Sequence, residues 1–252
     1  MHYPSGVPAD QPTILATSGG FVADEWLERR FGPLLHYAVD LAGVTGRTPR
    51  VCMINTAGGD QAAAMHSFDE AARVAGFQLS HLKLFSMPNV PDIAAHLNGQ
   101  DVIWVGGGSV ANLLAVWQVH GLGEILRDCW QAGVVLSGVS AGSICWHVGG
   151  STDSFGPQLR AVTNGLAFLP YGNGVHYDSE RRRRPTIHDL VARQVLPDTY
   201  CTDDGVGLLY RGTEMAEALT ERDRAGAYLV RRAGEGVQEE RIEPRRLPAV
   251  PR

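Results

Sequence analysis

The stretch VVLSGVSAGSICWH, residues 134–147, places a serine between two glycines directly after an apolar run that fits a buried β-strand. Residues 138–142 match G-x-S-x-G, and SICW follows, available to open a helix. In a nucleophile elbow, small flanking residues relieve crowding in a sharp strand-to-helix turn that holds the serine hydroxyl out. The alternative is a purely structural tight turn between strand and helix. Because both flanking segments have the required pattern, we favour Ser140 as a nucleophile.

The chain before this stretch alternates short apolar segments with longer amphipathic ones. Apolar runs typical of strands lie at residues 13–18, 50–57, 78–85, 101–107 and 133–140. Helical periodicity lies between them, at residues 23–43, 59–76, 91–99 and 109–133. This alternation predicts an α/β fold, a three-layer α/β/α sandwich with a mainly parallel central sheet. Ligands bind such sheets at the carboxyl ends of the strands, where SGG (18–20), VGGGS (105–109) and Ser140 all fall.

After residue 150 the sequence becomes rich in Gly, Asn and Pro, which predicts short strands and long loops. A helix is expected at residues 185–196, and strands of a terminal antiparallel section at 206–212 and 226–234. The polar, proline-containing tail from residue 239 is expected to be loosely held chain. We find no repeat or linker, so we expect one α/β domain over residues 1–252, with its core at about 12–232 and a peripheral tail at 233–252.

Composition narrows the class of protein. The formal net charge of −5 over 252 residues gives no general electrostatic case for binding nucleic acid or an anionic membrane. The four cysteines include no CxxC pair, which is typical of reduced thiols in a cytosolic enzyme. Residues 1–12 lack the cationic start and apolar core of a signal peptide, and no apolar run approaches the roughly 18 residues of a membrane span. We therefore expect a cytoplasmic protein.

A serine hydroxyl is unreactive unless a base takes its proton, and the base needs an orienting carboxylate. His176, in the Gly-rich segment YGNGVHYDSE, is the best placed base for Ser140. Asp203 and Asp204 lie in CTDDG at a turn between two apolar segments, where a plain β-turn is an equal alternative. His36, His66 and His120 lie in helical patterns, where a surface or interhelical role is expected. His147 lies only seven residues after Ser140, on the segment that leads away from it, so it is poorly placed to act as its base.

The order of these residues along the chain differs from that of the α/β-hydrolases. Ser140, His176 and Asp204 run Ser-His-Asp, whereas α/β-hydrolases run Ser-Asp-His. Asp178 followed by His188 would restore the hydrolase order, but both would have to come from one short segment. We therefore favour the Ser-His-Asp order.

The segment VGGGSVANLL, residues 105–114, has two interpretations. It matches the dinucleotide fingerprint G-x-G-x-x-A, but the next strand ends in Ser137 and Gly138 instead of an acidic residue. No lysine follows that would make it a phosphate-binding P-loop. The alternative is that Gly107 or Gly108 supplies a backbone N–H beside that of Ala141, forming an oxyanion hole.

Four segments in this order and spacing resemble the peptidase E (dipeptidase E) family of serine peptidases: VGGGSVANLL, GVSAGSICW, GLAFLPYGNGVHYD and CTDDGVGLLY. The family is related to cyanophycinase and to the class I glutamine amidotransferase-like (flavodoxin-like) fold. The resemblance covers roughly residues 12–232. It implies a Ser-His-Glu/Asp triad that cleaves dipeptides, or releases N-terminal residues, without a metal or other cofactor.

Carried onto this chain, the resemblance implies Ser140 as nucleophile, His176 as general base and Asp204 as orienting acid, with Asp203 as the alternative. Ser109 follows the triple glycine where the family usually has Asn, so it is a candidate substrate contact. The implied partner is a short peptide, and a homodimer stays open. The alternatives are an esterase or amidase acting on a non-peptide metabolite, and a catalytically inactive binding protein.

The run RRRR, residues 181–184, begins five positions after His176. Such a run is usually a solvated helix start. The alternative is that one arginine, Arg181 or Arg184, reaches back to bind a substrate carboxylate with its two parallel N–H groups.

Overall fold

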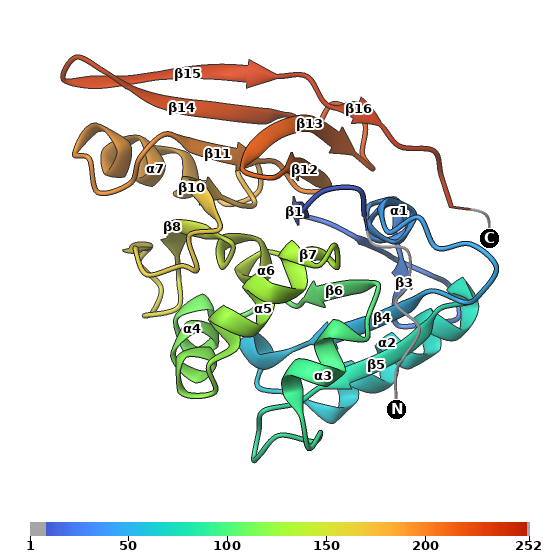
Figure 1. Cartoon of the computed structure of the whole chain (residues 1–252). Helices are drawn as coiled ribbons and strands as arrows, with labels where there is room; N and C mark the ends of the chain where they lie inside the picture. Colours follow the sequence, from blue (N-terminus) through green and yellow to red (C-terminus); the bar gives the residue numbers. More distant parts are fainter. Residues whose placement is uncertain (1–8, 251–252) are drawn as a thin grey trace.

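The computed structural model describes residues 9–250, which form two main β-sheets with helices packed on them (Figure 1). Residues 1–8 and 251–252 lie outside the described part of the chain. The signal-peptide prediction for residues 1–12 therefore falls mostly outside it, as does the very end of the predicted tail. The larger sheet has eight strands in the order β16-β13-β12-β1-β7-β6-β4-β5. These strands are β1 (Thr13–Thr17), β4 (Arg50–Ile54), β5 (Gln78–Leu82), β6 (Val102–Val105), β7 (Val135–Val139), β12 (Val206–Arg211), β13 (Glu214–Thr220) and β16 (Arg245–Arg246).

Five neighbouring strands of this sheet run parallel, in the order β1-β7-β6-β4-β5. β12 pairs antiparallel with β1. Two helices cover one face, α1 (Pro33–Leu41) and α2 (Ala62–Ala75), and pack on Leu15, Met53 and Trp104. The side chains that alternate with these, including Ile14 and Ile54, pack on the opposite face. The helices on that face are α3 (Ile93–Asn98), α4 (Val110–Val119) and α5 (Leu122–Gln131). The predicted three-layer α/β/α arrangement with a mainly parallel sheet is confirmed.

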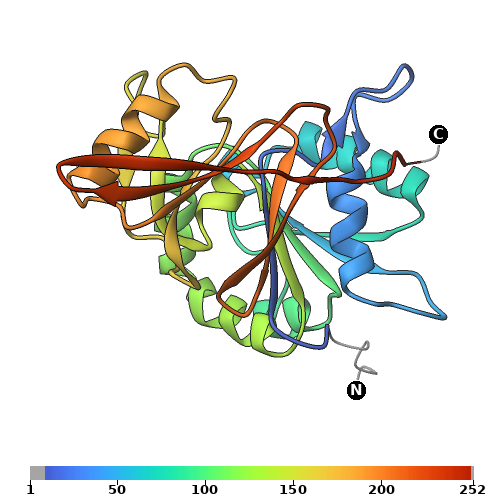
Figure 2. The same cartoon turned by 90° about the horizontal axis from the view of Figure 1, so that it is seen from above.

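The second sheet has six strands in the order β15-β14-β11-β10-β8-β9. Its strands are β8 (His147–Thr152), β9 (Arg160–Val162), β10 (Leu169–Gly174), β11 (Thr199–Thr202), β14 (Ala227–Ala233) and β15 (Gly236–Ile242). The short helix α6 (Ala141–Ile144) connects β7 of the first sheet to β8 of the second, so it lies where the sheets meet. The long hairpin β14–β15 runs over α7 (Arg183–Ala192) (Figures 1 and 2).

The prediction of a helix over residues 23–43 is wrong for the first half of this range. The structure has a two-stranded hairpin there, β2 (Phe21–Val22) paired with β3 (Arg30–Phe31), and the helix begins only at Pro33. Proline disfavours helical backbone in the residue before it but is well suited to the first helical position. Gly32 accordingly has extended φ and ψ angles of −87° and 175°.

The single helix expected over residues 109–133 is also wrong, because the structure has two helices, α4 and α5. They separate at Gly121, whose φ of 66° lies in the left-handed region that glycine adopts without steric cost. An apolar pattern continues across the break because both helices bury one face against the same side of the sheet. Periodicity alone therefore did not reveal the turn.

The prediction that the tail is loosely held from residue 239 is wrong for residues 239–246, which belong largely to two strands. Gly236–Ile242 form β15, which pairs with β14 along its whole length, and Arg245 and Arg246 pair with the end of β13. The polar sequence is explained because β15 is an edge strand with mostly exposed side chains. Pairing with β14, together with partial burial of Val237 and Ile242, orders this segment.

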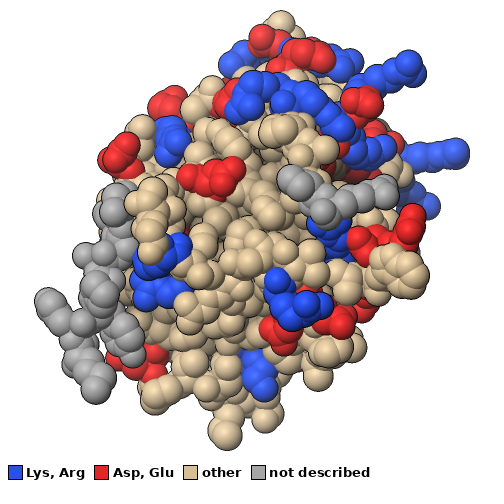
Figure 3. Space-filling view, turned by 90° about the vertical axis from the view of Figure 1, so that its right-hand side faces the viewer, with Lys and Arg blue, Asp and Glu red and all other residues tan. Residues whose placement is uncertain are grey.

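Figure 3 shows the face of the molecule that lies to the right in Figure 1. Basic side chains gather at its upper end, where β13–β16 lie, and acidic side chains stand among them. Ion pairs such as Arg245–Glu217, at 2.6 Å, account for this mixing of charges. Separately, none of the helices in residues 9–250 is both long and apolar enough to span a bilayer.

Candidate active site

Ser140 occupies a strained turn between β7 and α6. Its φ and ψ angles are 59° and −113°, a region that L-residues with a side chain rarely adopt. The flanking glycines are required by close packing: a Cβ added at Gly138 or Gly142 would lie 2.6 Å or 2.1 Å from the carbonyl oxygen of Val105. Both glycines thus let the turn lie against β6, and the strain falls on the serine between them. Strain of this kind clusters at functional sites.

His176 follows β10 and also has a positive φ, of 55°. Its ring Nδ1 lies 2.6 Å from Oδ1 of Asp204, and both side chains are partly exposed. The backbone N–H of Asp204 donates to Oδ1 of Asp178 at 2.8 Å. The Arg222 guanidinium lies 3.9 Å from the Asp204 carboxylate and donates to its carbonyl oxygen at 3.3 Å. The structure therefore brings the predicted imidazole and one predicted carboxylate into direct contact.

The end of β1 connects the segments that carry these three residues. The backbone N–H of Ser140 donates to the Thr17 carbonyl at 3.1 Å, and that of His176 donates to the Ser18 hydroxyl at 3.2 Å. The Ser18 carbonyl in turn accepts the N–H of Gly205, which directly follows Asp204, at 2.8 Å. Two consecutive residues, Thr17 and Ser18, thus accept hydrogen bonds from the backbone at or beside all three residues. In residues 9–250, no hydrogen bond joins the Ser140 hydroxyl to the His176 ring.

The glycine-rich loop after β6 lies beside Ser140. A Cβ added at Gly107 would lie 3.3 Å from Ser140 Cβ and 3.9 Å from its Oγ, whereas one at Gly108 would meet the Ala57 carbonyl. The N–H groups on either side, of Gly106 and Ser109, donate to carbonyls of Ile54 and Ala57. On the other side of Ser140, Ala141 opens α6, and the first N–H groups of a helix have no partner within it.

Among the described residues, Asp203, the alternative carboxylate, makes no hydrogen bond to His176. It is buried, and its Oδ2 accepts the backbone N–H of Gly226 at 2.8 Å and the hydroxyl of Tyr228 at 3.3 Å. Burial raises the pKa of this carboxyl. Ser109, a candidate substrate contact, caps α4 by accepting the N–H of Asn112 at 3.2 Å.

The four arginines of residues 181–184 have different environments. Arg181 is exposed, while Arg183 is buried and donates to Ser151. Arg184 bonds the Glu239 carboxylate, and its guanidinium lies over the rings of Tyr177 and Tyr228, 4.5 and 4.7 Å from their centroids. The structure thus brings Arg184 together with β15 and the residue after His176, not with Ser140.

Comparison with known proteins places the chain in a family. The model for peptidase family S51 matches residues 14–218, which include every residue of the predicted triad. The chain belongs to peptidase family S51. It is therefore a serine-type peptidase, and the resemblance to the peptidase E family is confirmed. Among the described residues, no group of three or more His, Cys, Asp or Glu side chains is arranged to hold a metal ion.

Relatives of this S51 peptidase agree with the assignment. An uncharacterized peptidase, YgaJ, from Bacillus subtilis (strain 168) is 39% identical over 191 residues, which are 76% of this chain and 82% of the relative. The crystal structure of a peptidase from an acI-B1 Actinobacterium superposes with a TM-score of 0.63 at 16% identity, covering 96% of this chain and 98% of the other. A putative peptidase E protein from Listeria monocytogenes EGD-e gives a TM-score of 0.57 at 16% identity, covering 92% and 100%. The two structures show that the fold is shared.

Sequence reasoning gave no role to Arg222 beside Asp204 or to Glu239 behind His176, and it considered Asp178 and Ser18 only for other roles, as a triad member and as part of the SGG segment. Ser18 could have been found, since it ends a central strand of the predicted sheet in the segment SGG. Arg222 and Glu239 carried no such signal, because they lie on a loop and an edge strand whose positions depend on the whole fold.

Proposed function

We propose that this S51 peptidase hydrolyses dipeptides or short peptides at the N-terminal residue through Ser140, His176 and Asp204. The observation that carries the proposal is the 2.6 Å contact of His176 Nδ1 with Asp204, combined with the strained elbow at Ser140. Asp203 is not proposed as the third member, because its carboxylate is bonded to Gly226 and Tyr228. Cleavage at the N-terminal residue rests on the resemblance to peptidase E.

The contact with Asp204 assigns a role to each nitrogen of the His176 ring. If Nδ1 carries the proton and donates it to Asp204, Nε2 keeps a lone pair and acts as the base. The Ser140 hydroxyl attacks the peptide carbonyl while Nε2 takes its proton. The protonated ring then gives this proton to the departing amine, which leaves an acyl-enzyme. Water, deprotonated by the same nitrogen, attacks the ester and restores Ser140.

The negative charge of the tetrahedral intermediate needs donors on the far side of Ser140 from the base. We assign these to the N–H groups of Ala141 and Gly107. Gly107 is preferred to Gly108 because it directly faces Ser140, whereas the α-carbon of Gly108 faces Ala57. Preorganised backbone donors of this kind typically contribute about 3 kcal/mol each to transition-state stabilisation.

Two measurements test the proposal. A fluorophosphonate probe should label the wild-type protein at Ser140 and leave Ser140→Ala unlabelled. Dipeptides should be hydrolysed, and the same peptides with an acetylated N-terminus should not be. Labelling without hydrolysis of any peptide, but with hydrolysis of simple esters or amides, would favour an esterase or amidase using the same residues. Absence of labelling would favour an inactive binding protein.

A further inference from the structure

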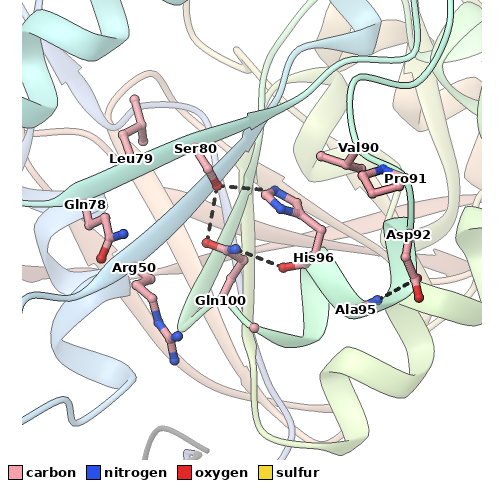
Figure 4. Close-up of a pocket in the computed structure, with 11 residues that line it drawn as sticks. Arg50, Gln78, Leu79, Ser80, Val90, Pro91, Asp92, Ala95, His96 and Gln100 are labelled. Atoms are coloured by element: carbon pink, nitrogen blue, oxygen red, sulfur yellow. Dashed lines mark hydrogen bonds between the residues drawn. The ribbon is translucent and has the colours of Figure 1, made fainter. Parts of the chain in front are cut away.

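A cavity of about 420 Å³ lies between β5, the start of β4 and α3, at the edge of the large sheet (Figure 4). Its polar lining includes Arg50, Gln78, Ser80, His96 and Gln100, and its apolar lining includes Val90 and Pro91. Leu79 borders it through β5, but the Leu79 side chain packs on the opposite face of the sheet. This volume fits a small organic molecule. No residue of the proposed triad contributes to the lining.

The cavity is at the opposite end of the sheet from Ser140. β4, β5, β6 and β7 run parallel, and Arg50 and Gln78 are the first residues of their strands. Ser140 follows the last residue of β7. The length of the sheet therefore separates the two places, and a molecule held in the cavity does not touch the proposed catalytic residues.

The Arg50 guanidinium has unused hydrogen-bond donors. In residues 9–250 its side-chain nitrogens donate to no acceptor, and its Nε is buried without a hydrogen-bond partner. The nearest carboxylate is that of Asp101, 3.9 Å from this Nε. Arg47 already binds both Asp101 oxygens, at 2.5 and 2.6 Å, and the backbone N–H of Arg50 binds one of them at 2.7 Å. Asp101 is thus occupied by other donors.

The other polar groups of the cavity are largely satisfied by one another. Ser80 donates to Gln100 at 3.3 Å and lies 3.4 Å from His96 Nε2, and Gln100 donates to the His96 carbonyl at 2.9 Å (Figure 4). Asp92, the acidic residue among the described lining, is exposed and accepts the N–H of Ala95 at the start of α3. The cavity therefore combines a guanidinium group that makes no side-chain hydrogen bond to the described residues, a preformed polar wall, and the apolar side chains of Val90 and Pro91.

We propose that this cavity binds a small carboxylate with a short apolar body, held by Arg50 through paired N–H···O bonds. Guanidinium and carboxylate are geometrically matched for two parallel hydrogen bonds. The apolar body would lie against Val90 and Pro91. This inference does not depend on the proposed function, because it concerns binding at a site that no triad residue lines.

Binding of isovalerate, compared with its neutral amide isovaleramide, tests the proposal on the full-length protein. Isovalerate should shift the amide NMR signals of residues 78–80 and 95–100, and isovaleramide should bind at least about tenfold more weakly. Arg50→Gln should remove this difference, and Arg50→Lys should retain part of it. Arg73→Gln, at an exposed arginine on α2, is the matched control and should bind as the wild type does.

A second variant keeps the test decisive if Arg50→Gln folds poorly. Ala95 is exposed on α3 and lines the cavity, so Ala95→Phe should fill it and abolish isovalerate binding without disturbing the core. The proposal is overturned if isovalerate shifts none of these signals at millimolar concentration, or if isovaleramide or inorganic phosphate binds equally well. Undiminished binding by Arg50→Gln or Ala95→Phe overturns it too. None of these outcomes bears on hydrolysis at Ser140.

Discussion

The hydroxyl oxygen of Ser18 accepts the backbone N–H of His176 at 3.2 Å, across 158 positions of sequence. Ser18 also lies 2.7 Å from the Thr202 hydroxyl, and its carbonyl accepts the N–H of Gly205. His176 has a positive φ, so its backbone conformation is strained and is held by its contacts. The hydrogen bond between Ser18 and this backbone therefore influences the direction of the His176 ring. Ser18 is thus a positioning residue for the proposed base.

Ser18→Ala should lower kcat by about tenfold with little change in KM, because the base loses one restraint while substrate contacts remain. Thr202→Val is the matched control, since it removes the Ser18···Thr202 bond but keeps the bond to His176. The measurement is steady-state kinetics on a hydrolysed dipeptide. Equal losses in both variants would show that Ser18 acts through general stability.

Asp204 and Asp203 are adjacent but are expected to behave differently. Asp204→Asn should reduce kcat by roughly 10³ to 10⁴, because the amide cannot orient the His176 tautomer as the carboxylate does. Asp203→Ala should retain most activity but lower the free energy of unfolding by about 1–3 kcal/mol, since it removes the acceptor of the buried Gly226 N–H and of the half-buried Tyr228 hydroxyl.

Kinetics and urea unfolding on both proteins separate the two roles. If Asp203→Ala lost activity as severely as Asp204→Asn while keeping its stability, the assignment of Asp204 as the orienting acid would be wrong.

The glycines around Ser140 should divide into structural and catalytic ones. Gly142→Ala should lower the free energy of unfolding by about 3 kcal/mol or more, because its new Cβ would lie 2.1 Å from the Val105 carbonyl oxygen. Gly107→Ala would place its Cβ 3.3 Å from Ser140 Cβ, 3.6 Å from the Val139 carbonyl oxygen and 3.9 Å from Ser140 Oγ. A small shift relieves these contacts, so the protein should fold, and the methyl group should lower kcat by crowding the Ser140 hydroxyl. Thermal unfolding and kinetics check both. A stable, fully active Gly107→Ala protein would contradict the prediction that catalysis needs the space beside Ser140.

The sequence predicted the site in part, and the reason lies in which contacts are local. The elbow at Ser140 is a local feature, since residues 138–142 and their flanking segments contain all its requirements. The choice between Asp203 and Asp204 depends on a distant contact, because both residues lie in one turn. Only the position of Gly226 shows that the Asp203 carboxylate already accepts a backbone N–H. The role of Ser18 likewise requires the fold to close around β1.

The same distinction explains the errors in the fold. The strands with continuous apolar sequence are buried on both faces, so their pattern was informative. β15 has mostly exposed side chains, so its pairing with β14 left no apolar pattern in EERIE. Glu239 adds polar contacts to this pairing, because its carboxylate accepts the Tyr177 hydroxyl at 2.7 Å and lies 2.8 Å from His188 Nε2.

Glu239→Gln should therefore lower the free energy of unfolding by about 1–2 kcal/mol, because it weakens bonds from Tyr177, His188 and Arg184 at once. Glu240→Gln, at the next position of the same strand, removes only an exposed pair with Arg231 and should cost less than about 0.5 kcal/mol. Urea unfolding at neutral pH compares them. Equal effects would show that the carboxylate of Glu239 has no special role.

Stability should fall as pH is lowered from 7 to 5, in part because of His147. This ring is fully buried between the Ser143 carbonyl, 2.9 Å from Nδ1, and the Tyr210 hydroxyl, 3.3 Å from Nε2. Burial lowers its pKa from 6.5 to about 4. Between these two values the unfolded chain binds a proton that the folded chain does not, so stability rises with pH there.

The contribution of this one group amounts to about 2 kcal/mol lost at pH 5 relative to pH 7. His147→Gln removes the titrating ring, so its free energy of unfolding should depend less steeply on pH than that of the wild type over this range. If the variant folds poorly, NMR of the wild type gives the same answer, because the His147 ring signals should not titrate above pH 5. A ring that titrates near pH 6.5 in the folded protein would refute the prediction, since folded and unfolded chains would then bind the proton equally.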